Sequence, residues 1–213
     1  LTYSTAYRIV HFLCEQGYVQ KASGKKYKLG SKLIQLGFRA YDSINLVRSA
    51  RPHLEVLNEQ TQDTVHLAVR ESGKVVYLDK LAGYRAVNIS SSIGGRKNLH
   101  NTGVGKALLL RDPPEEWARV YESEGGNPER KAEFLANMQR YARAGYALDL
   151  GEDSPNIRCV AAPILAKPDR LIAAISVSST VEYLDDERAG QLIQTVQAAA
   201  SEISFEVYGY RPD

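Results

Sequence analysis

The first thirty residues switch from apolar side chains at helical spacing to a short alternating pattern, and this switch restricts the fold most strongly. Residues 2–17 carry an apolar stripe of helical period, made by Ala6, Ile9, Val10, Phe12 and Leu13. Gly17 follows, and glycine commonly ends a helix. Residues 18–21 and 26–29 are joined by a polar turn that contains glycine, as in a β-hairpin. The pattern predicts one helix followed directly by one hairpin.

Positive charge is concentrated in the same end of the chain. The first fifty residues hold eight basic and two acidic side chains, a net charge of +6. Because the whole chain has a net charge of +2, residues 51–213 carry −4. A basic end on an acidic body is expected where only one end of a protein meets phosphates. On charge alone, a solvated helix face and a polar loop explain the pattern equally well.

A helix followed by a hairpin tipped with lysines is the order in which a winged-helix DNA-binding module ends, although other α+β folds contain the same pair. In such a module the helix enters the major groove of double-stranded DNA. There the guanidinium of Arg8 would pair with a guanine or contact a phosphate, and both roles stay open. The hairpin lysines would contact the backbone or the minor groove. The predicted DNA-binding residues are Tyr3, Ser4, Thr5, Arg8, Lys25 and Lys26.

The remaining chain predicts an antiparallel sheet covered by helices. Strand patterns occupy residues 64–70, 74–81, 85–91, 159–165 and 171–178. Helical patterns occupy residues 31–47, 106–110, 113–122, 129–144 and 185–207, and a further helix opens at Arg51-Pro52. Strands that come first, with helices around them, favour an antiparallel sheet covered by helices, an α+β layer design.

Four features of this body indicate a site for a small organic acid. Residues 103–105 (GVG) open a helix, which leaves backbone N–H groups free to meet a carboxylate. Ser176 and Ser178 are two residues apart on a predicted strand, so their hydroxyls share one face of the sheet. Cys159 begins the neighbouring predicted strand, and Asp149 precedes that strand.

Each of these residues also has a structural explanation. Small serines let a helix pack closely, a buried cysteine often serves as a small apolar group, and Asp149 can turn or cap the chain. His100 is expected to be a hydrogen-bonded structural histidine, since it shares no metal-ligand spacing with His53 or His66. We therefore expect neither a metal nor a cofactor.

Seven short motifs along the chain carry a family resemblance. They lie at residues 1–30, 51–54, 64–67, 99–109, 145–149, 158–163 and 173–178. The first, LTYSTAYRIVHFLCEQGYVQKASGKKYKLG, resembles the second half of the winged helix-turn-helix of IclR-type transcription regulators. The others, among them LHNTGVGKALL and RCVAAP, resemble the same family in the same order. The resemblance covers nearly the whole chain.

The resemblance implies an α+β fold with three parts. These are a truncated winged helix-turn-helix at residues 1–30, a linker helix at 31–47 and an effector-binding domain at 48–213. The last part would be a GAF-like or profilin-like sensor domain whose antiparallel sheet is flanked by helices. The implied effector pocket is lined by Gly103, Val104, Asp149, Cys159, Ser176 and Ser178, with Ala86 and Ile89 on its wall.

In function, the resemblance implies a transcriptional repressor or activator whose affinity for double-stranded DNA depends on a small organic acid. Similarity to the sugar-acid-responsive branch points to a sugar acid. A palindromic operator and a homodimer or homotetramer are also implied. Because the chain begins at Leu1, without the helices that precede a recognition helix, we expect the natural protein to be longer. Two distant cysteines and no bilayer-length apolar run predict a cytoplasmic protein without a membrane partner.

Two other functions stay open. An enzyme on the same body would use Cys159 as a nucleophilic or redox thiol, which requires a base or a positive neighbour. Arg158 is adjacent in sequence but would point to the opposite face of the strand, and His100 would have to be brought near by the fold. A sensor that acts through a protein partner would not need the basic end.

Overall fold

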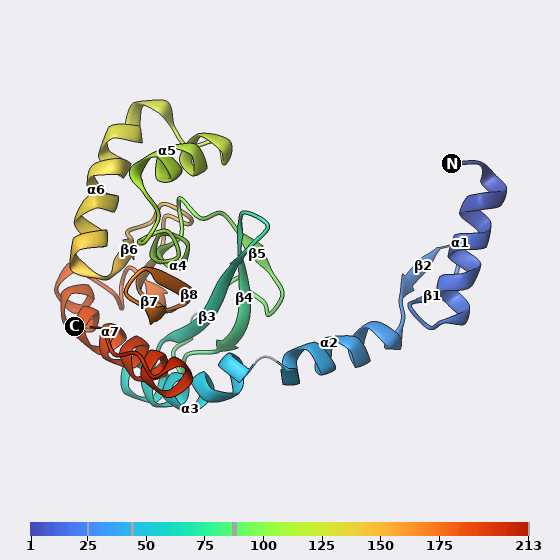
Figure 1. Ribbon diagram of the computed structural model, residues 1–213, viewed down its shortest axis with the longest axis horizontal. Coiled ribbons are helices and arrows are strands. Elements are labelled where there is room, and N and C mark those ends of the chain that lie inside the picture. Colours follow the sequence, from blue (N-terminus) through green and yellow to red (C-terminus); the bar gives the residue numbers. More distant parts are fainter. Residues whose placement is uncertain (25, 44, 87–88, 213) are drawn as a thin grey trace. The chain divides into compact units, whose positions relative to one another are not determined.

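The structure of the chain, a computed structural model, describes residues 1–24, 26–43, 45–86 and 89–212 (Figure 1). The chain divides into two compact units, Leu1–Arg48 and Ser49–Asp213, which we call the N-terminal and C-terminal units. None of the described helices combines the length and the apolar character that crossing a membrane requires.

The N-terminal unit is built in the order that the sequence predicts. Its elements are α1 (Tyr3–Glu15), β1 (Val19–Lys21), β2 (Tyr27–Leu29) and α2 (Ser31–Ser43). The two strands pair antiparallel, with Val19 opposite Leu29. Thr2 caps α1, because its Oγ1 accepts a hydrogen bond from the backbone N–H of Thr5 at 3.4 Å. The predicted helix followed by a hairpin is therefore present.

Two glycines hold α1 and the hairpin together. Gly17 ends α1 with a φ of +74°, a left-handed conformation that side chains other than glycine rarely adopt. The N–H of Gly30 donates to the carbonyl of Tyr18 at 2.8 Å. A Cβ atom on Gly30 would lie 2.0 Å from the carbonyl oxygen of Gly17. Only glycine therefore fits where the end of β2 passes the end of α1.

The helical stripe predicted for residues 2–17 is partly wrong. Ala6, Val10 and Leu13 are half-buried, but Ile9 and Phe12 are 46% and 56% exposed. Ile9 and Phe12 each precede a half-buried residue by one position, which moves them about 100° around the helix axis. They therefore leave the face that packs against β1.

The helices between residues 31 and 61 differ from the predicted boundaries. The helix expected over residues 31–47 is α2 up to Ser43, and α3 (Asn45–Thr61) then begins six residues before Arg51. Pro52 lies inside α3 instead of near its start. Proline removes one helical hydrogen bond, but helical residues on both sides continue the element here. Residue 44 and the side chains of Phe38 and Tyr41 lie outside the described part.

The C-terminal unit contains a six-stranded antiparallel sheet of order β5-β4-β3-β8-β7-β6. Its strands are β3 (Thr64–Glu71), β4 (Lys74–Leu81), β5 (Arg96–Lys97), β6 (Ala147–Asp149), β7 (Ile157–Lys167) and β8 (Arg170–Thr180). The two hairpins predicted from sequence, β3–β4 and β7–β8, are confirmed. Pairing between β3 and β8 joins them into one sheet.

The strand predicted over residues 85–91 is wrong. Residues 85–86 and 89–91 carry no strand in the described part, and β5 takes the position beside β4 instead. The chain leaves the sheet after β4 because Asn58 donates to the carbonyl of Ala82 at 3.1 Å. Arg85 then pairs with the buried carboxylate of Asp63 at 2.9 Å. These tertiary contacts outweigh the weak strand pattern.

Helices cover both faces of the sheet (Figure 1). One face packs on α3 and on α7 (Asp186–Tyr208), and Leu165 donates its N–H to the hydroxyl of Ser204 in α7 at 3.0 Å. The other face meets a short helix, α4, and two longer ones. Their bounds are α4 (Gly103–Ala107), α5 (Pro114–Ser123), the 3₁₀ turn η1 (Pro128–Arg130) and α6 (Lys131–Ala144). The helix predicted over residues 106–110 corresponds to α4, which ends at Ala107, three residues before the predicted end.

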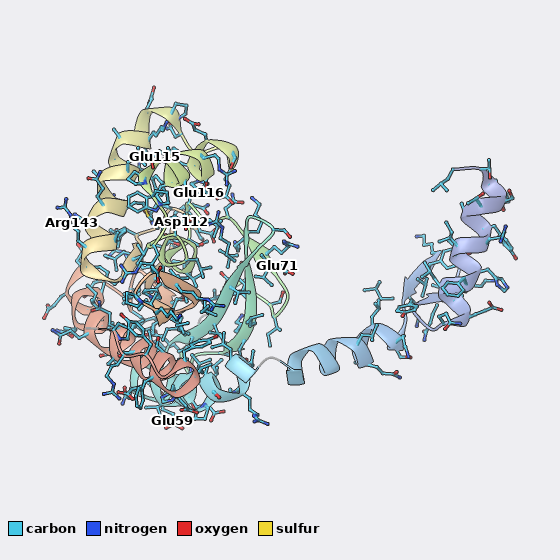
Figure 2. The ribbon with its side chains drawn as sticks, in the orientation of Figure 1. Glu59, Glu71, Asp112, Glu115, Glu116 and Arg143 are labelled. Atoms are coloured by element: carbon cyan, nitrogen blue, oxygen red, sulfur yellow. The ribbon has the colours of Figure 1, made fainter. Side chains whose placement is uncertain are left out.

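Arg70 fastens the α5 end of this layer to the sheet. Asp112 and Glu116 lie near one another where α5 begins (Figure 2). Their carboxylates each accept a hydrogen bond from the guanidinium of Arg70 in β3 at 2.5 Å. All three side chains are partly buried, and burial raises the pKa of Asp112 although Arg70 attracts its charge, so the contact fixes the position of α5 more than it adds stability.

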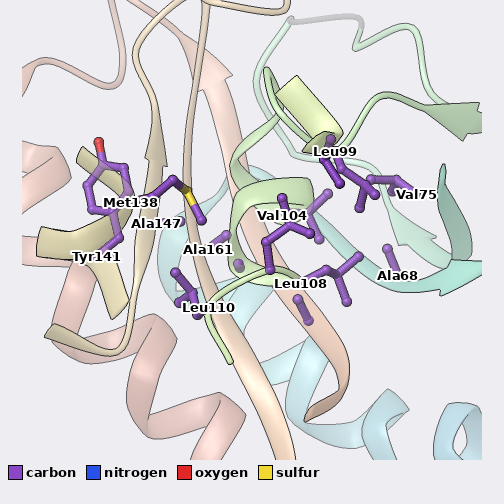
Figure 3. Close-up of a cluster of buried hydrophobic side chains, with 14 of the residues drawn as sticks. Ala68, Val75, Leu99, Val104, Leu108, Leu110, Met138, Tyr141, Ala147 and Ala161 are labelled. Carbon is purple, nitrogen blue, oxygen red and sulfur yellow. The ribbon is translucent and has the colours of Figure 1, made fainter. Parts of the chain in front are cut away.

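The apolar core on this side continues from the sheet into the helices. Val104, Leu108 and Leu110, in α4 and the turn after it, form one buried cluster with side chains of the sheet and with Met138 and Tyr141 of α6 (Figure 3). All five side chains are buried. The sheet under α4 contributes mostly alanine, so the short helix approaches the strands closely. This close approach places the start of α4 against polar residues of the same sheet face.

Candidate functional site

Two rows of side chains cross the sheet under α4. In the first row Asp149 of β6 pairs with Cys159 of β7, Cys159 with Ser178 of β8, and Ser178 with Thr64 of β3. The second row, two residues along, consists of Ala147, Ala161, Ser176 and His66. Paired residues and residues two apart share one face of a sheet. We call Asp149, Cys159, Ser176, Ser178 and His66 the polar sheet face.

Gly103 meets this face at its closest point. A Cβ atom on Gly103 would lie 2.7 Å from the sulfur of Cys159 and 3.3 Å from the backbone nitrogen of Asp149. Glycine is therefore required for close approach. Within the described part of the chain, the N–H groups of Gly103 and Val104 donate to no acceptor, whereas that of Gly105 donates to Oγ1 of Thr102 at 3.1 Å. Two free donors thus point out of the first turn of α4.

α4 itself is a weaker anion site than the sequence predicts. It has five residues, and the partial charge at a helix end comes from aligned peptide dipoles over several turns. The favourable feature is therefore local: two free N–H groups close to buried hydroxyls.

Asp149 connects the polar sheet face to the ion pair between the buried Lys106 and the exposed Glu152. Its Oδ1 accepts hydrogen bonds from the N–H groups of Gly151 and Glu152 at 2.9 and 2.8 Å, so it also turns the chain after β6. Glu152 receives the ammonium of Lys106 at 2.6 Å, and that lysine is only 2% exposed. Burial raises the pKa of Asp149 to about 7, and the neighbouring Glu152 adds to the increase. Asp149 therefore changes charge near neutral pH.

Cys159 is a neutral thiol in this setting. Burial raises its pKa to about 11, and the nearby charge of Asp149 adds to the increase. A nucleophilic cysteine needs the opposite shift. Arg158 points to the other side of β7, where it binds the carboxylate of Asp186 at 2.6 Å. The Nδ1–H of His100 donates to the carboxylate of Glu124 at 2.9 Å, so this residue is the hydrogen-bonded histidine that we expected.

His66 and Lys80 attach the segment that follows β4 to the same face. Nε2 of His66 lies 2.7 Å from the hydroxyl of Ser91, and its Nδ1 lies 3.5 Å from the hydroxyl of Ser176. The ammonium of Lys80 donates to the carbonyls of Ile89 and Ser91 at 2.7 and 2.8 Å. Burial, with the charge of Lys80, lowers the pKa of His66 to about 3. The imidazole is therefore neutral.

The structure brings most of the predicted effector residues together, but not all of them. Gly103, Asp149, Cys159, Ser176 and Ser178 come together, all buried, and Val104 turns into the apolar core beside them. Ile89 is half-buried near Lys80, whereas Ala86 is exposed.

Sequence reasoning missed His66, Lys106, Glu152 and Tyr77. The ring of Tyr77 packs against that of His66 at an angle of 42°, with ring centroids 4.9 Å apart. One signal was available for Lys106, which follows Gly103 by three positions and so shares its side of a helix. For His66 no local signal exists, since its place depends on the pairing of β3 with β8.

The predicted DNA-binding residues that the structure describes are all exposed on the N-terminal unit. Tyr3, Ser4, Thr5 and Arg8 are exposed on α1, and Lys26 is exposed at the start of β2. The hydroxyls of Ser4 and Thr5 lie 3.2 and 2.9 Å from that of the capping residue Thr2. Lys25 lies outside the described residues. In the described part of the chain no group of three or more His, Cys, Asp or Glu residues could hold a metal ion.

Comparison with known proteins identifies the family of the chain. A family model described as "Bacterial transcriptional regulator IclR C-terminal" matches residues 38–205. The HTH-type transcriptional regulator KdgR of Escherichia coli (strain K12) is 30% identical over 97% of this chain and 81% of its own length.

Solved structures agree as well. A crystal structure of the Thermotoga maritima IclR matches with a TM-score of 0.77 and 27% identity, over 99% of this chain and 87% of that one. A structure of an IclR homologue from Microbacterium hydrocarbonoxydans, complexed with 4-hydroxybenzoate, has a TM-score of 0.81 at 24% identity, a likeness of fold. It covers 99% of this chain and 88% of that one. The chain belongs to the IclR family of bacterial transcriptional regulators.

Proposed function

We propose that α1 and the β1–β2 hairpin bind operator DNA, and that a small organic acid bound between α4 and the polar sheet face controls the operator affinity. One observation carries the effector site: free N–H groups at Gly103 and Val104 lie against the buried hydroxyl side of the sheet. Free amides and hydroxyls together suit a carboxylate that also bears hydroxyl groups. This chemistry favours a sugar acid or another hydroxy acid.

The three-part organisation belongs to the same proposal. Residues 1–30 would read DNA, residues 31–47 would transmit the signal, and residues 48–213 would sense the effector. A homodimer or homotetramer would place two reading units on a palindromic operator, because the symmetry of the protein is matched by the DNA. The effector would change operator affinity by about 1–3 kcal/mol, the usual size of such coupling.

The polar sheet face is buried, so a ligand has to displace its cover. The hydrogen bonds described above attach the segment Ile89–Ser91 to the sheet through two side chains, those of Lys80 and His66. A carboxylate that engages Gly103 and the serine hydroxyls would compete with the bond between His66 and Ser91. Release of this segment is the first structural change that we expect on effector binding.

The effector class is tested by thermal-shift screening of the chain against sugar acids, keto acids and aromatic acids, 4-hydroxybenzoate among them. A ligand that binds only the folded state raises the melting temperature by mass action. We expect hydroxy acids of sugar size to give the largest rise. No stabilisation by any acid would contradict the effector part of the proposal.

Base reading is tested at Arg8. Arg8→Ala is expected to cost about 1–3 kcal/mol of operator affinity and to reduce the preference for the guanine that the guanidinium contacts. The measurement is fluorescence anisotropy with the operator and with single-base variants, using a protein that carries the complete DNA-binding domain. An unchanged preference among the base variants would assign Arg8 to a phosphate.

Lys26→Ala is the matched comparison. It removes a charge that we expect to contact the DNA backbone, so it should weaken binding to all DNA sequences alike. The slope of log affinity against log salt concentration should become shallower by about one.

Removal of residues 1–30 distinguishes a regulator from the alternative, an enzyme with Cys159 as its thiol. An enzyme keeps its activity without them, whereas a regulator loses its operator.

Effector affinity should depend on pH through Asp149. If an anionic ligand sits beside it, only the protonated carboxyl can donate a hydrogen bond to that ligand. With the pKa raised to about 7, affinity should be constant at lower pH and fall as pH rises above that value. The fall should approach roughly tenfold per pH unit.

Isothermal titration at several pH values measures this effect. Asp149→Asn keeps a donor and an acceptor at the position, so its affinity should be nearly independent of pH. A wild-type affinity that does not change across pH 7 would remove Asp149 from contact with the ligand.

A further inference from the structure

A cavity lies beside α4, and its lining does not include the polar sheet face. Its volume is about 250 Å³, a little below the range of roughly 300–1,000 Å³ that is usual for small-molecule pockets. It is bounded by the loop before α4, by α5, η1 and α6, and by the turn after β6. The site described above does not use these surfaces, apart from Lys106 and Glu152 at the border.

One wall of the cavity is aromatic and held in place. The rings of Tyr121 and Phe134 stack with centroids 4.6 Å apart, and His100 meets the ring of Tyr121 edge-on at 5.2 Å. The hydroxyl of Tyr121 donates to the carbonyl of Asn127 at 2.8 Å. Because these contacts orient the rings without a ligand, the wall is preformed for an apolar C–H surface.

The charged groups of the lining are already paired. Lys106 binds Glu152 at 2.6 Å, and Arg130 binds Glu133 at 3.1 Å. The two cations and two anions give the lining no formal net charge. An anionic ligand would have to break one of these pairs, whereas a neutral ligand leaves both intact.

Unpaired hydrogen-bonding groups remain between the ion pairs. Oδ1 of Asn101 is buried and has no hydrogen-bond partner in the described part of the chain. Oδ1 of Asn137 accepts from Arg140 at 3.1 Å, which leaves its amide N–H groups available. With Nδ1 of His100 on the carboxylate of Glu124, Nε2 is left as an acceptor. The cavity therefore offers both donors and acceptors, and a buried acceptor without a partner is costly.

We propose that this cavity binds a neutral polyhydroxylated ligand the size of a monosaccharide. Hydroxyl groups both donate and accept, so they match Asn101, Asn137 and His100 together. The C–H face of a sugar ring matches the wall of Tyr121 and Phe134. The volume admits one such ring.

The border of the cavity connects the ligand to the effector site. Glu152 holds Lys106 through its carboxylate and donates its backbone N–H to Asp149 at 2.8 Å. A ligand that hydrogen-bonds Glu152 or Lys106 would shift the charges around Asp149. Occupation of the cavity is therefore expected to change the affinity of the polar sheet face, and the reverse follows by linkage.

The test uses the whole chain and a panel of neutral probes: glucose, galactose, xylose, arabinose, mannitol and myo-inositol. Binding is followed by the ¹⁵N signals of the asparagine side chains. We expect at least one probe to bind with a dissociation constant of about 10 mM or tighter. The signals of Asn101 and Asn137 should shift. Gluconate should bind this cavity more weakly than glucose, since the cations of the lining are paired.

Two substitutions and two controls complete the test. Asn137→Leu and Asn101→Leu should each weaken the bound probe about tenfold, the usual effect of a lost hydrogen bond. Asn156→Ala, on the exposed turn before β7, should change nothing. Ser176→Ala should leave sugar binding intact, which separates this site from the proposed effector site. Failure of every probe, tighter binding of gluconate, or no effect of both leucine variants would overturn the proposal.

Discussion

Gly30→Ala is expected to abolish operator binding while leaving the C-terminal unit folded. The new Cβ would lie 2.0 Å from the carbonyl oxygen of Gly17 and 2.9 Å from the carbonyl carbon of Tyr18, and both are backbone atoms. No side-chain movement relieves such a contact. The hairpin has to move away from α1, which breaks the bond from Gly30 to Tyr18. We expect a loss of about 3 kcal/mol or more, at the upper end for overpacked positions.

Hydrogen exchange measures this effect separately in the two units. Amides of α1 and β2 should exchange faster in the variant, whereas those of β3 and β8 should not change. Gly37→Ala is the matched control, because a Cβ there meets nothing within 4 Å. In an exposed helix that change should stabilise by roughly 0.5–1 kcal/mol. Unchanged exchange and operator affinity in the Gly30 variant would show that the packing at Gly17 is wrong.

Replacing Ser176 and Ser178 together by alanine is expected to weaken effector binding by about a hundredfold or more. Each hydroxyl is buried, and each would lose a hydrogen bond to a charged ligand worth about 1.5–3 kcal/mol. The alanines fit the space of the serines, so the sheet is preserved. Operator affinity without effector should therefore equal that of the wild type. Isothermal titration and an operator-release assay measure the two quantities.

Ser179→Ala separates this effect from a general loss of stability. Ser179 is buried on the same strand, but it faces the other side, where its hydroxyl donates to Asp63 at 2.7 Å. Its replacement should lower the free energy of unfolding and leave effector affinity unchanged. A double alanine variant that still responds to effector would place the ligand away from the polar sheet face.

The sequence predicted part of the candidate site because some of its geometry is local. Alternation along a strand was enough to put Ser176 and Ser178 on one side, and the structure agrees. The glycines of residues 103–105 were enough to mark the start of α4. In contrast, the position of Ala86 was taken from the family resemblance, and the described chain leaves it exposed.

Where sequence predictions failed, tertiary contacts overrode weak local patterns. The pattern of residues 85–91 resembles a strand, but Asn58 and Asp63 bind the chain just after β4 and direct it away from the sheet. Proline usually marks the start of a helix, yet Pro52 lies inside α3. In both cases the local preference is small compared with the contacts that the folded unit supplies.

The sequence by itself determined the order of helix and hairpin, the two hairpins of the sheet, the basic end and the family. These follow from periodicity, turn residues and composition, which act over a few neighbours along the chain. Only the tertiary structure decided that His66 lies beside Ser176, that Lys106 is buried against Glu152, and that Asp149 titrates near neutral pH. Strand register and burial join residues that are 110 positions apart for His66 and Ser176 and 46 apart for Lys106 and Glu152, and no local pattern contains that information.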